Sequence, residues 1–61
     1  MAKVELSTGI KHATFTVTSP TKEMAATKLN SMLINKYGQQ NVSVTGDTVK
    51  IFDTVSKMIW K

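Results

Sequence analysis

The chain has 61 residues, of which 41% are hydrophobic and 20% charged, and this composition excludes a disordered or fibrous protein. The length predicts a single small domain, residues 1–61, because a second domain would need about twice as many residues. So small a core leaves a net stability of about 3–5 kcal/mol. The chain has no cysteine, so neither a disulfide nor a thiolate-bound metal can add to this stability, which leaves tight packing or self-association.

Eight basic residues against four acidic ones give a net charge of +4, and all eight are lysine. Arginine is the side chain that recognises guanine through two hydrogen bonds. Its absence excludes a protein that reads DNA sequence through arginine–guanine pairs. Salt-sensitive binding to phosphates stays open as an alternative. The candidate residues for it are Lys3, Lys11, Lys22, Lys28, Lys36 and Lys50. A charge that merely keeps the surface soluble is the simpler interpretation.

The N-terminal residues contain no apolar run of signal-peptide length, and no stretch of the chain approaches the roughly 20 apolar residues of a membrane span. We therefore expect a cytoplasmic protein, in the host cytoplasm if the chain is viral, with no contact to a membrane.

Residues 3–18 alternate between apolar and polar side chains with a period of two. Val4 and Leu6 share the inward parity of the first run, and Phe15 and Val17 share that of the second. Threonine, valine and phenylalanine favour strands, and a glycine-containing turn separates the two runs. This pattern predicts a β-hairpin.

Ser19 and Pro20 end the alternation. Serine is a favoured helix N-cap, and proline fits the first helical position because its missing N–H is not needed there. Apolar residues then recur every three or four positions as far as Tyr37, and Gly38 follows where a left-handed C-cap residue would sit. We predict an amphipathic helix over residues 20–37.

The period of two returns after this helix. Val42 and Val44 alternate with polar neighbours, and Val49 and Ile51 continue the inward parity after a Gly-Asp turn, which predicts a second hairpin. The tail, residues 53–61, fits two structures. We favour a short C-terminal helical turn, and an extension of the last strand is the alternative.

The order β-β-α-β-β predicts an α+β, two-layer fold in which one helix packs on a four-stranded antiparallel or mixed sheet. The expected core consists of Val4, Leu6, Ala13, Phe15, Val17, Val42, Val44, Val49 and Ile51 packed against Ala26, Leu29, Met32 and Leu33. One helix covers one face of a sheet, so we expect the other face to be open, polar and rich in threonine.

Phe52 and Trp60 are large aromatic residues with no expected place in the core, and such residues anchor protein interfaces. Together with Lys50, and with His12 as a candidate for pH sensitivity, they form the predicted partner-binding site. The single histidine, the four dispersed carboxylates and the isolated glycines match no catalytic, metal-binding or phosphate-binding pattern. We therefore expect no enzymatic activity, no cofactor and no metal.

In layout and size, a hairpin followed by Ser-Pro, a helix ending in Tyr-Gly and then Val-Ser-Val-Thr resembles small phage-encoded accessory proteins that bind and modulate a host protein. This resemblance implies a regulator or inhibitor that acts by binding. The leading hypothesis is a small interaction module that binds a protein partner, or a second copy of itself as a possible dimer. The alternatives are a nucleic-acid-associated regulator and a structural or assembly component.

Overall fold

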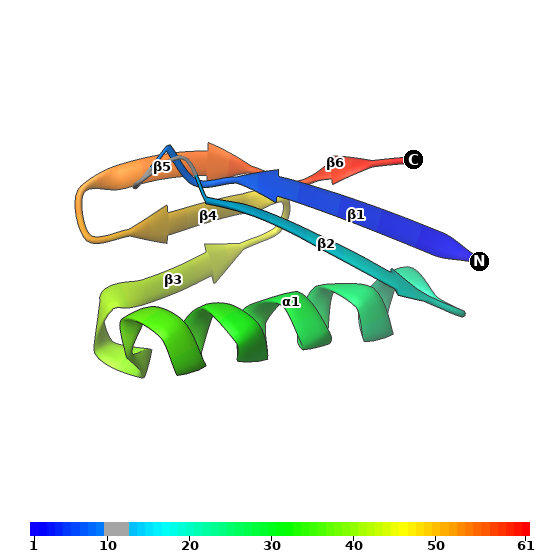
Figure 1. Cartoon of the computed structure of the whole chain (residues 1–61), viewed down its shortest axis with the longest axis horizontal. Coiled ribbons are helices and arrows are strands. Elements are labelled where there is room, and N and C mark those ends of the chain that lie inside the picture. Colours follow the sequence, from blue (N-terminus) through cyan, green and yellow to red (C-terminus); the bar gives the residue numbers. More distant parts are fainter. Residues whose placement is uncertain (10–12) are drawn as a thin grey trace.

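The computed structural model of the chain describes residues 1–9 and 13–61. Within them the fold is α+β, as predicted, and Figure 1 shows one long helix beneath the strands. The elements in chain order are β1 (Ala2–Ser7), β2 (Thr14–Ser19), α1 (Lys22–Tyr37), the short 3-10 helix η1 (Gln39–Asn41), β3 (Val42–Thr45), β4 (Thr48–Ile51), β5 (Thr54–Lys57) and β6 (Ile59–Trp60).

The described strands form two three-stranded antiparallel sheets, so the predicted single four-stranded sheet is wrong. One sheet has the order β2-β1-β6, and the other has the order β3-β4-β5. The tail causes this difference, because β5 pairs with β4 whereas β6 pairs with β1. Only Met58 separates β5 from β6, and the chain passes from one sheet to the other at that residue.

The predicted helical turn in residues 53–61 is also wrong, because this segment is extended. Val55, Lys57 and Ile59 are exposed, whereas Met58 between them is only 5% exposed. This period of two is that of a strand. Met58 therefore belongs to the core at the junction of the two sheets.

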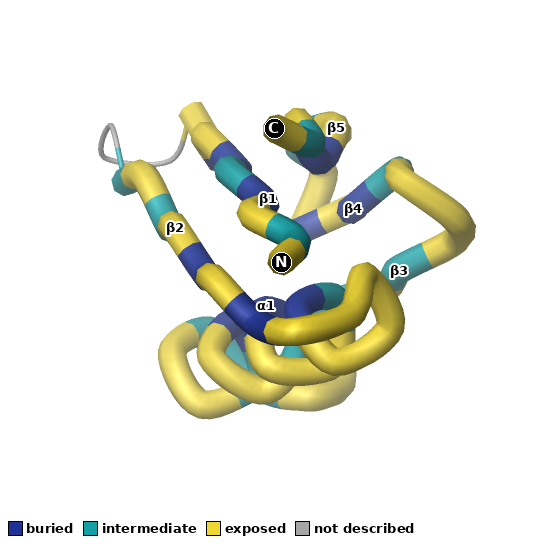
Figure 2. The backbone as a smooth tube through the Cα atoms, turned by 90° about the vertical axis from the view of Figure 1, so that its right-hand side faces the viewer, coloured by how far each residue is buried: buried dark blue, intermediate teal, exposed yellow. Residues whose placement is uncertain are grey.

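The helix α1 contacts strands of both sheets and lies between β2 and β3 in the end-on view of Figure 2. The buried core is made by both sheets and α1, and its members are Val4, Leu6, Val17, Ala25, Leu29, Leu33, Val49, Ile51 and Met58. Two core predictions are wrong: Met32 is 41% exposed, and Ala13 lies outside the core cluster. Ala25, which was not among the expected core residues, is fully buried.

The helix begins two residues later than predicted, at Lys22. Thr21 is its N-cap, and the Thr21 side chain accepts a hydrogen bond of 3.2 Å from the backbone N–H of Met24. Ser19 instead ends β2 opposite Ala2 and is buried. The predicted cap at Ser19 is therefore wrong, because pairing with β1 holds this residue in the ladder.

The predicted end of the helix is confirmed. Tyr37 is its last residue, and Gly38 follows with a φ of +97°, a backbone conformation that favours glycine. The Gly38 N–H donates a hydrogen bond of 2.8 Å to the carbonyl oxygen of Ile34. The short segment that follows, η1, brings the side chain of Asn41 within hydrogen-bond distance of the Tyr37 carbonyl oxygen.

Candidate functional site

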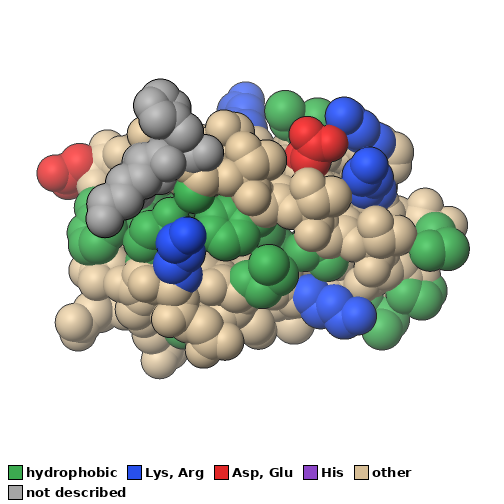
Figure 3. Space-filling view, viewed as in Figure 1, with side chains coloured by type: hydrophobic (Ala, Val, Ile, Leu, Met, Phe, Trp, Pro, Cys, Tyr) green, Lys and Arg blue, Asp and Glu red, His purple; other side chains and the backbone are tan. Residues whose placement is uncertain are grey.

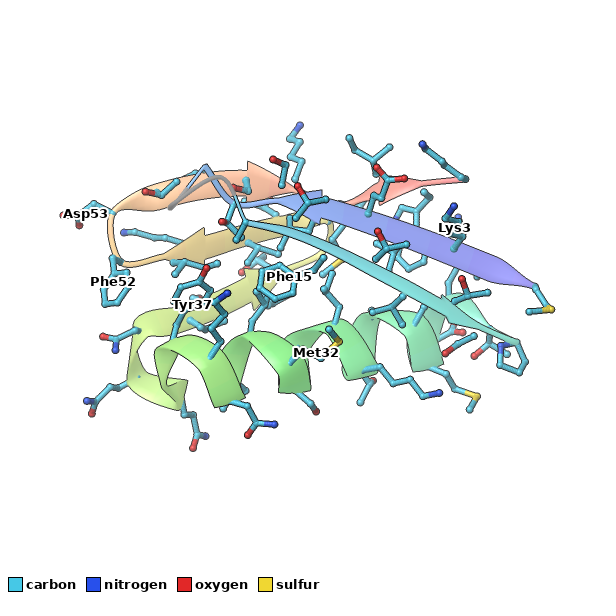
Figure 4. All side chains as sticks on the ribbon, in the orientation of Figure 1. Lys3, Phe15, Met32, Tyr37, Phe52 and Asp53 are labelled. Atoms are coloured by element: carbon cyan, nitrogen blue, oxygen red, sulfur yellow. The ribbon has the colours of Figure 1, made fainter. Side chains whose placement is uncertain are left out.

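Three aromatic rings from distant parts of the sequence meet near the C-terminal end of α1. Phe15 comes from β2, Tyr37 ends α1, and Phe52 lies in the turn between β4 and β5. The ring centroids are 6.4 Å apart for Phe15 and Tyr37, and 6.1 Å apart for Tyr37 and Phe52, both in edge-to-face geometry. Figure 4 shows the three side chains between the strands and the helix. We call Phe15, Tyr37 and Phe52 the aromatic patch.

Phe52 is 53% exposed and is held in an unfavourable backbone conformation. Its φ is +54°, in the left-handed region, which costs a residue with a side chain roughly 1–2 kcal/mol. Two hydrogen bonds fix the turn against the helix end. The Phe52 N–H donates to the Asn41 carbonyl oxygen at 3.0 Å, and the Asn41 side-chain amide donates to the Tyr37 carbonyl oxygen at 2.7 Å.

A lysine and a methionine border the aromatic patch. The Lys36 ammonium lies 5.4 Å from the centroid of Phe15 and 5.9 Å from that of Tyr37, which is the range of cation–π attraction. Met32 lies one helical turn before Lys36 and is 41% exposed. Figure 3 shows apolar side chains gathered on this face of the molecule with a lysine among them. The aromatic patch is thus an apolar surface with a positive charge on its border.

The hydroxyl of Tyr37 is buried at the aromatic patch and has no hydrogen-bond partner among the described residues. A buried hydroxyl without a partner destabilises a fold by about 1–3 kcal/mol. The aromatic patch therefore contains two local features, this hydroxyl and the Phe52 backbone, that folding alone does not favour.

Trp60 lies at the other end of α1, in a second cluster that we call the Trp60 corner. The Trp60 indole N–H donates a hydrogen bond of 3.1 Å to the Asp47 carboxylate, and the Lys22 ammonium lies 5.4 Å from the indole centroid. These residues line a shallow hollow of about 260 Å³ together with Glu23, Ala26 and Gly46. The indole packs partly against the core, so the Trp60 corner joins the C-terminal strand to the β3–β4 turn.

The structure does not bring Phe52 and Trp60 together. Phe52 contacts Tyr37 and Trp60 contacts Lys22, and these two helical residues are about 22 Å apart along the axis at 1.5 Å per residue. Lys50 is exposed on β4, two residues before Phe52. His12 and Lys11 lie outside the described residues.

Two of the candidate phosphate-binding lysines lie on the core-facing side of α1. At 100° per residue, Lys22 and Lys36 are each about 20° from Leu29 around the helix, one at either end. Each ammonium lies over an aromatic ring. Lys28 is exposed on α1, Lys3 on β1 and Lys50 on β4, so the described lysines are distributed over separate surfaces.

Sequence reasoning missed Phe15 and Tyr37 as members of the site, because apolar parity placed both inside. Both are only half-buried, at the rim of the core. One available signal was Lys36, because a lysine on the apolar side of a helix marks the point where that side reaches solvent.

An ion pair lies on the outer face of the β2-β1-β6 sheet. The Lys61 ammonium lies 2.9 Å from the Glu5 carboxylate, and the Glu5 side chain is 30% exposed. The hydrogen bond and charge of Lys61, with a smaller contribution from Lys3, lower the pKa of Glu5 below its ordinary value of 4.5. The pair joins β1 to the residue after β6.

Within residues 1–9 and 13–61, no three histidine, cysteine, aspartate or glutamate side chains lie close enough to hold a metal ion. None of the described helices is long and apolar enough to cross a membrane. Comparison of the chain with protein-family models, with curated proteins and with solved structures gave no match.

Proposed function

We propose that this chain is a small, non-enzymatic module that binds a protein partner through the aromatic patch and regulates that partner by binding it. The observation that carries this proposal is Phe52, a half-exposed aromatic ring held at a φ of +54°. Strained residues of this kind persist only when their surroundings enforce them, and they gather at functional sites. If residue 52 served only to form the turn, glycine or asparagine would suit its positive φ better than phenylalanine.

The contacts of the patch favour binding because they fix the rings before a partner arrives. Tyr37 packs edge-on against both Phe15 and Phe52, and Asn41 joins the turn to the helix end. A fixed ring loses little side-chain freedom when it becomes an interface, so more of its contact energy contributes to affinity. Aromatic residues in such positions are typical interface hot spots.

The partner surface that fits the aromatic patch is an apolar side chain with an acidic group beside it. The rings of Phe15, Tyr37 and Phe52 supply apolar contact, and the Lys36 ammonium at their border can accept a carboxylate as a neighbour. This charge would also discriminate against partners that present a lysine or arginine at the same point.

The alternative of phosphate binding through lysines has weaker support. Lys22 and Lys36 lie over aromatic rings, and Lys3, Lys28 and Lys50 are on separate elements. Binding to a nucleic-acid backbone would weaken steeply with salt, whereas an apolar interface would not. A gel-shift assay with single- and double-stranded DNA and RNA at low salt tests this alternative, and the absence of any shift would exclude it.

Site-specific photo-crosslinking tests the proposed surface. Benzoylphenylalanine replaces Phe52 in one protein and Val55 in a control, since Val55 is also an exposed apolar residue (62%) but lies on β5 away from the patch contacts. Each protein is irradiated in a lysate of the cells in which the chain normally functions. We expect a discrete crosslinked protein from position 52 and none from position 55.

Competition makes this test specific to the aromatic patch. Excess unmodified chain should remove the crosslink at position 52, whereas excess Phe52→Asn chain should not. A crosslink of equal strength at both positions, or competition by the Phe52→Asn chain as strong as by the unmodified chain, would overturn the proposal.

A further inference from the structure

The strand β2 has one paired side and one free side. It pairs with β1, and no described strand lies beyond it in the order β2-β1-β6. Figure 2 shows β2 as the outermost strand on its side of the molecule. The free side of an edge strand presents backbone N–H and C=O groups that can pair with another chain.

The hairpin geometry identifies which backbone groups face this free side. Antiparallel ladders alternate between pairs that exchange hydrogen bonds and pairs that do not. The Thr8 N–H donates to the Ala13 carbonyl oxygen at 3.0 Å, so Ala13 and every second residue after it face β1. The backbone groups of Thr14, Thr16 and Thr18 therefore point away from β1, toward the free side.

A second hydrogen bond, on the opposite side of β1, confirms this alternation. The Lys61 N–H donates to the Lys3 carbonyl oxygen at 2.9 Å, so the backbone of Lys3 faces β6 and not β2. Lys3 is the residue opposite Thr18 in the hairpin, so these two do not bond to each other. The backbone hydrogen bonds outside regular elements, among the described residues, include none from Thr14, Thr16 or Thr18.

This edge lacks the features that usually prevent pairing. Proteins protect edge strands with charged residues, bulges, prolines or a very short length. The six residues of β2, Thr-Phe-Thr-Val-Thr-Ser, include no charged side chain and no proline, and they favour strands strongly. The other edge strands of the two sheets are shorter: β3 and β5 have four residues each, and β6 has two.

We propose that two copies of this chain associate by antiparallel pairing of their β2 strands, centred on Thr16. In this register Thr16 bonds to Thr16 of the second copy, and Thr14 bonds to its Thr18. On the inner side of the sheet, Phe15 lies opposite Val17 of the second copy, and aromatic residues pair well with β-branched ones. The β2-β1-β6 sheets of the two copies then form one continuous six-stranded sheet.

The side chains of β2 suit a second copy as the occupant, because they are uncharged and the register keeps like charges apart although each chain carries a net charge of +4. In the proposed register the outward row through Lys3 and Thr18 continues through Thr14 to Ser7 of the second copy, so it brings no like charges together. The Glu5 residues of the two copies lie in one row, three strand spacings or about 14 Å apart. This distance exceeds the Debye length of about 8 Å at physiological salt, so their repulsion is largely screened. The six β2 residues of each copy carry no charge, and the Lys36 ammonium lies beside them over the ring of Phe15.

Matched double variants test both the dimer and its register. In Thr14→Lys/Thr18→Glu, each lysine would lie opposite a glutamate of the second copy. In Thr14→Lys/Thr18→Lys, each lysine would lie opposite a lysine, which destabilises a strand pair. Light scattering after size exclusion measures the mass over a dilution series, and circular dichroism verifies that each variant is folded.

We expect the unmodified chain and the lysine/glutamate variant to reach twice the monomer mass of 6.7 kDa, and the lysine/lysine variant to stay at that mass. If the lysine/lysine variant does not fold, Thr16→Lys is the substitute, because it places two lysines opposite each other at the centre. Thr45→Lys, exposed on β3 opposite Thr48, adds the same single charge as Thr16→Lys and is the control that should remain dimeric.

An unmodified chain that remains at 6.7 kDa throughout would overturn the proposal, as would equal masses for the two double variants. The inference does not depend on the proposed function. Light scattering involves no foreign partner, so this test can fail while crosslinking from position 52 succeeds, and the reverse also holds.

Discussion

The ring of Phe52 lies edge-on to the ring of Tyr37, with centroids 6.1 Å apart and an interplanar angle of 84°. The contact joins a hairpin turn to the last residue of α1, and the hydrogen bonds of Asn41 reinforce it. Because Phe52 has a positive φ, the ring contact and the backbone conformation act in opposite directions on stability. This opposition is the basis for separating a binding role of Phe52 from a folding role.

The substitution Phe52→Asn should leave stability nearly unchanged. Asparagine tolerates a positive φ better, a gain of about 1 kcal/mol, while the lost edge-to-face pair costs about 0.5–1.5 kcal/mol. We expect the free energy of unfolding in urea to change by less than about 1 kcal/mol. A loss above about 2 kcal/mol would instead assign the ring to the structural core.

The two candidate helix caps should respond in opposite ways to alanine. Thr21→Ala removes the side chain that accepts from Met24 and should destabilise the protein by about 1 kcal/mol. Ser19→Ala removes a buried hydroxyl that has no partner among the described residues, so we expect no loss or a gain of up to about 1 kcal/mol. Thermal unfolding of both variants measures this, and a larger loss for Ser19→Ala would restore Ser19 as the cap.

Met58 should be essential to the fold, because it fills the core where the chain changes sheets. Truncation of a buried methionine costs about 2–5 kcal/mol, which equals most of the stability expected for a domain of this size. We expect Met58→Ala to be largely unfolded at 25 °C by circular dichroism, and Met58→Leu to stay folded. Met24→Ala, at a residue 46% exposed, is the control and should be neutral. Equal stability of the two alanine variants would contradict this role.

The Glu5–Lys61 pair should make stability depend on pH in the acidic range. The pKa of Glu5 is lower in the folded state than its ordinary value of 4.5, so the ionised carboxylate stabilises the fold above that pH. This stabilisation is lost as the pH falls through the lowered pKa. We expect the difference in melting temperature between the unmodified chain and Glu5→Gln to shrink below pH 4.5, and to shrink in high salt. A difference independent of pH would contradict it.

Local sequence patterns were sufficient to predict the first hairpin, the central helix and the second hairpin. Gly38 and the Gly46–Asp47 turn fell where predicted because glycine is favoured at a positive φ. The tail could not be predicted in the same way, since Val55, Met58 and Ile59 fit both a helical turn and a strand. Its structure depends on pairing with β1, more than 50 residues away in sequence, and local periodicity carries no information on such partners.

The candidate site was predicted only in part. Phe52 was identified because its parity left it outside the core, and it is exposed as expected. Its neighbours Phe15 and Tyr37 have inward parity, and only the tertiary structure shows that their rings reach the rim and meet Phe52. Trp60 was grouped with Phe52 because both are aromatic, although the two residues lie at opposite ends of α1.

The most direct measurement is the affinity of the crosslinked partner for three purified chains: unmodified, Phe52→Asn and Val55→Asn. Both substitutions introduce the same side chain at an exposed apolar position, and only the first lies in the aromatic patch. We expect Kd to rise at least tenfold for Phe52→Asn, as for an interface hot spot, and to change less than about twofold for Val55→Asn. An unchanged Kd for Phe52→Asn, or equal losses for both, would contradict the aromatic patch as the docking surface.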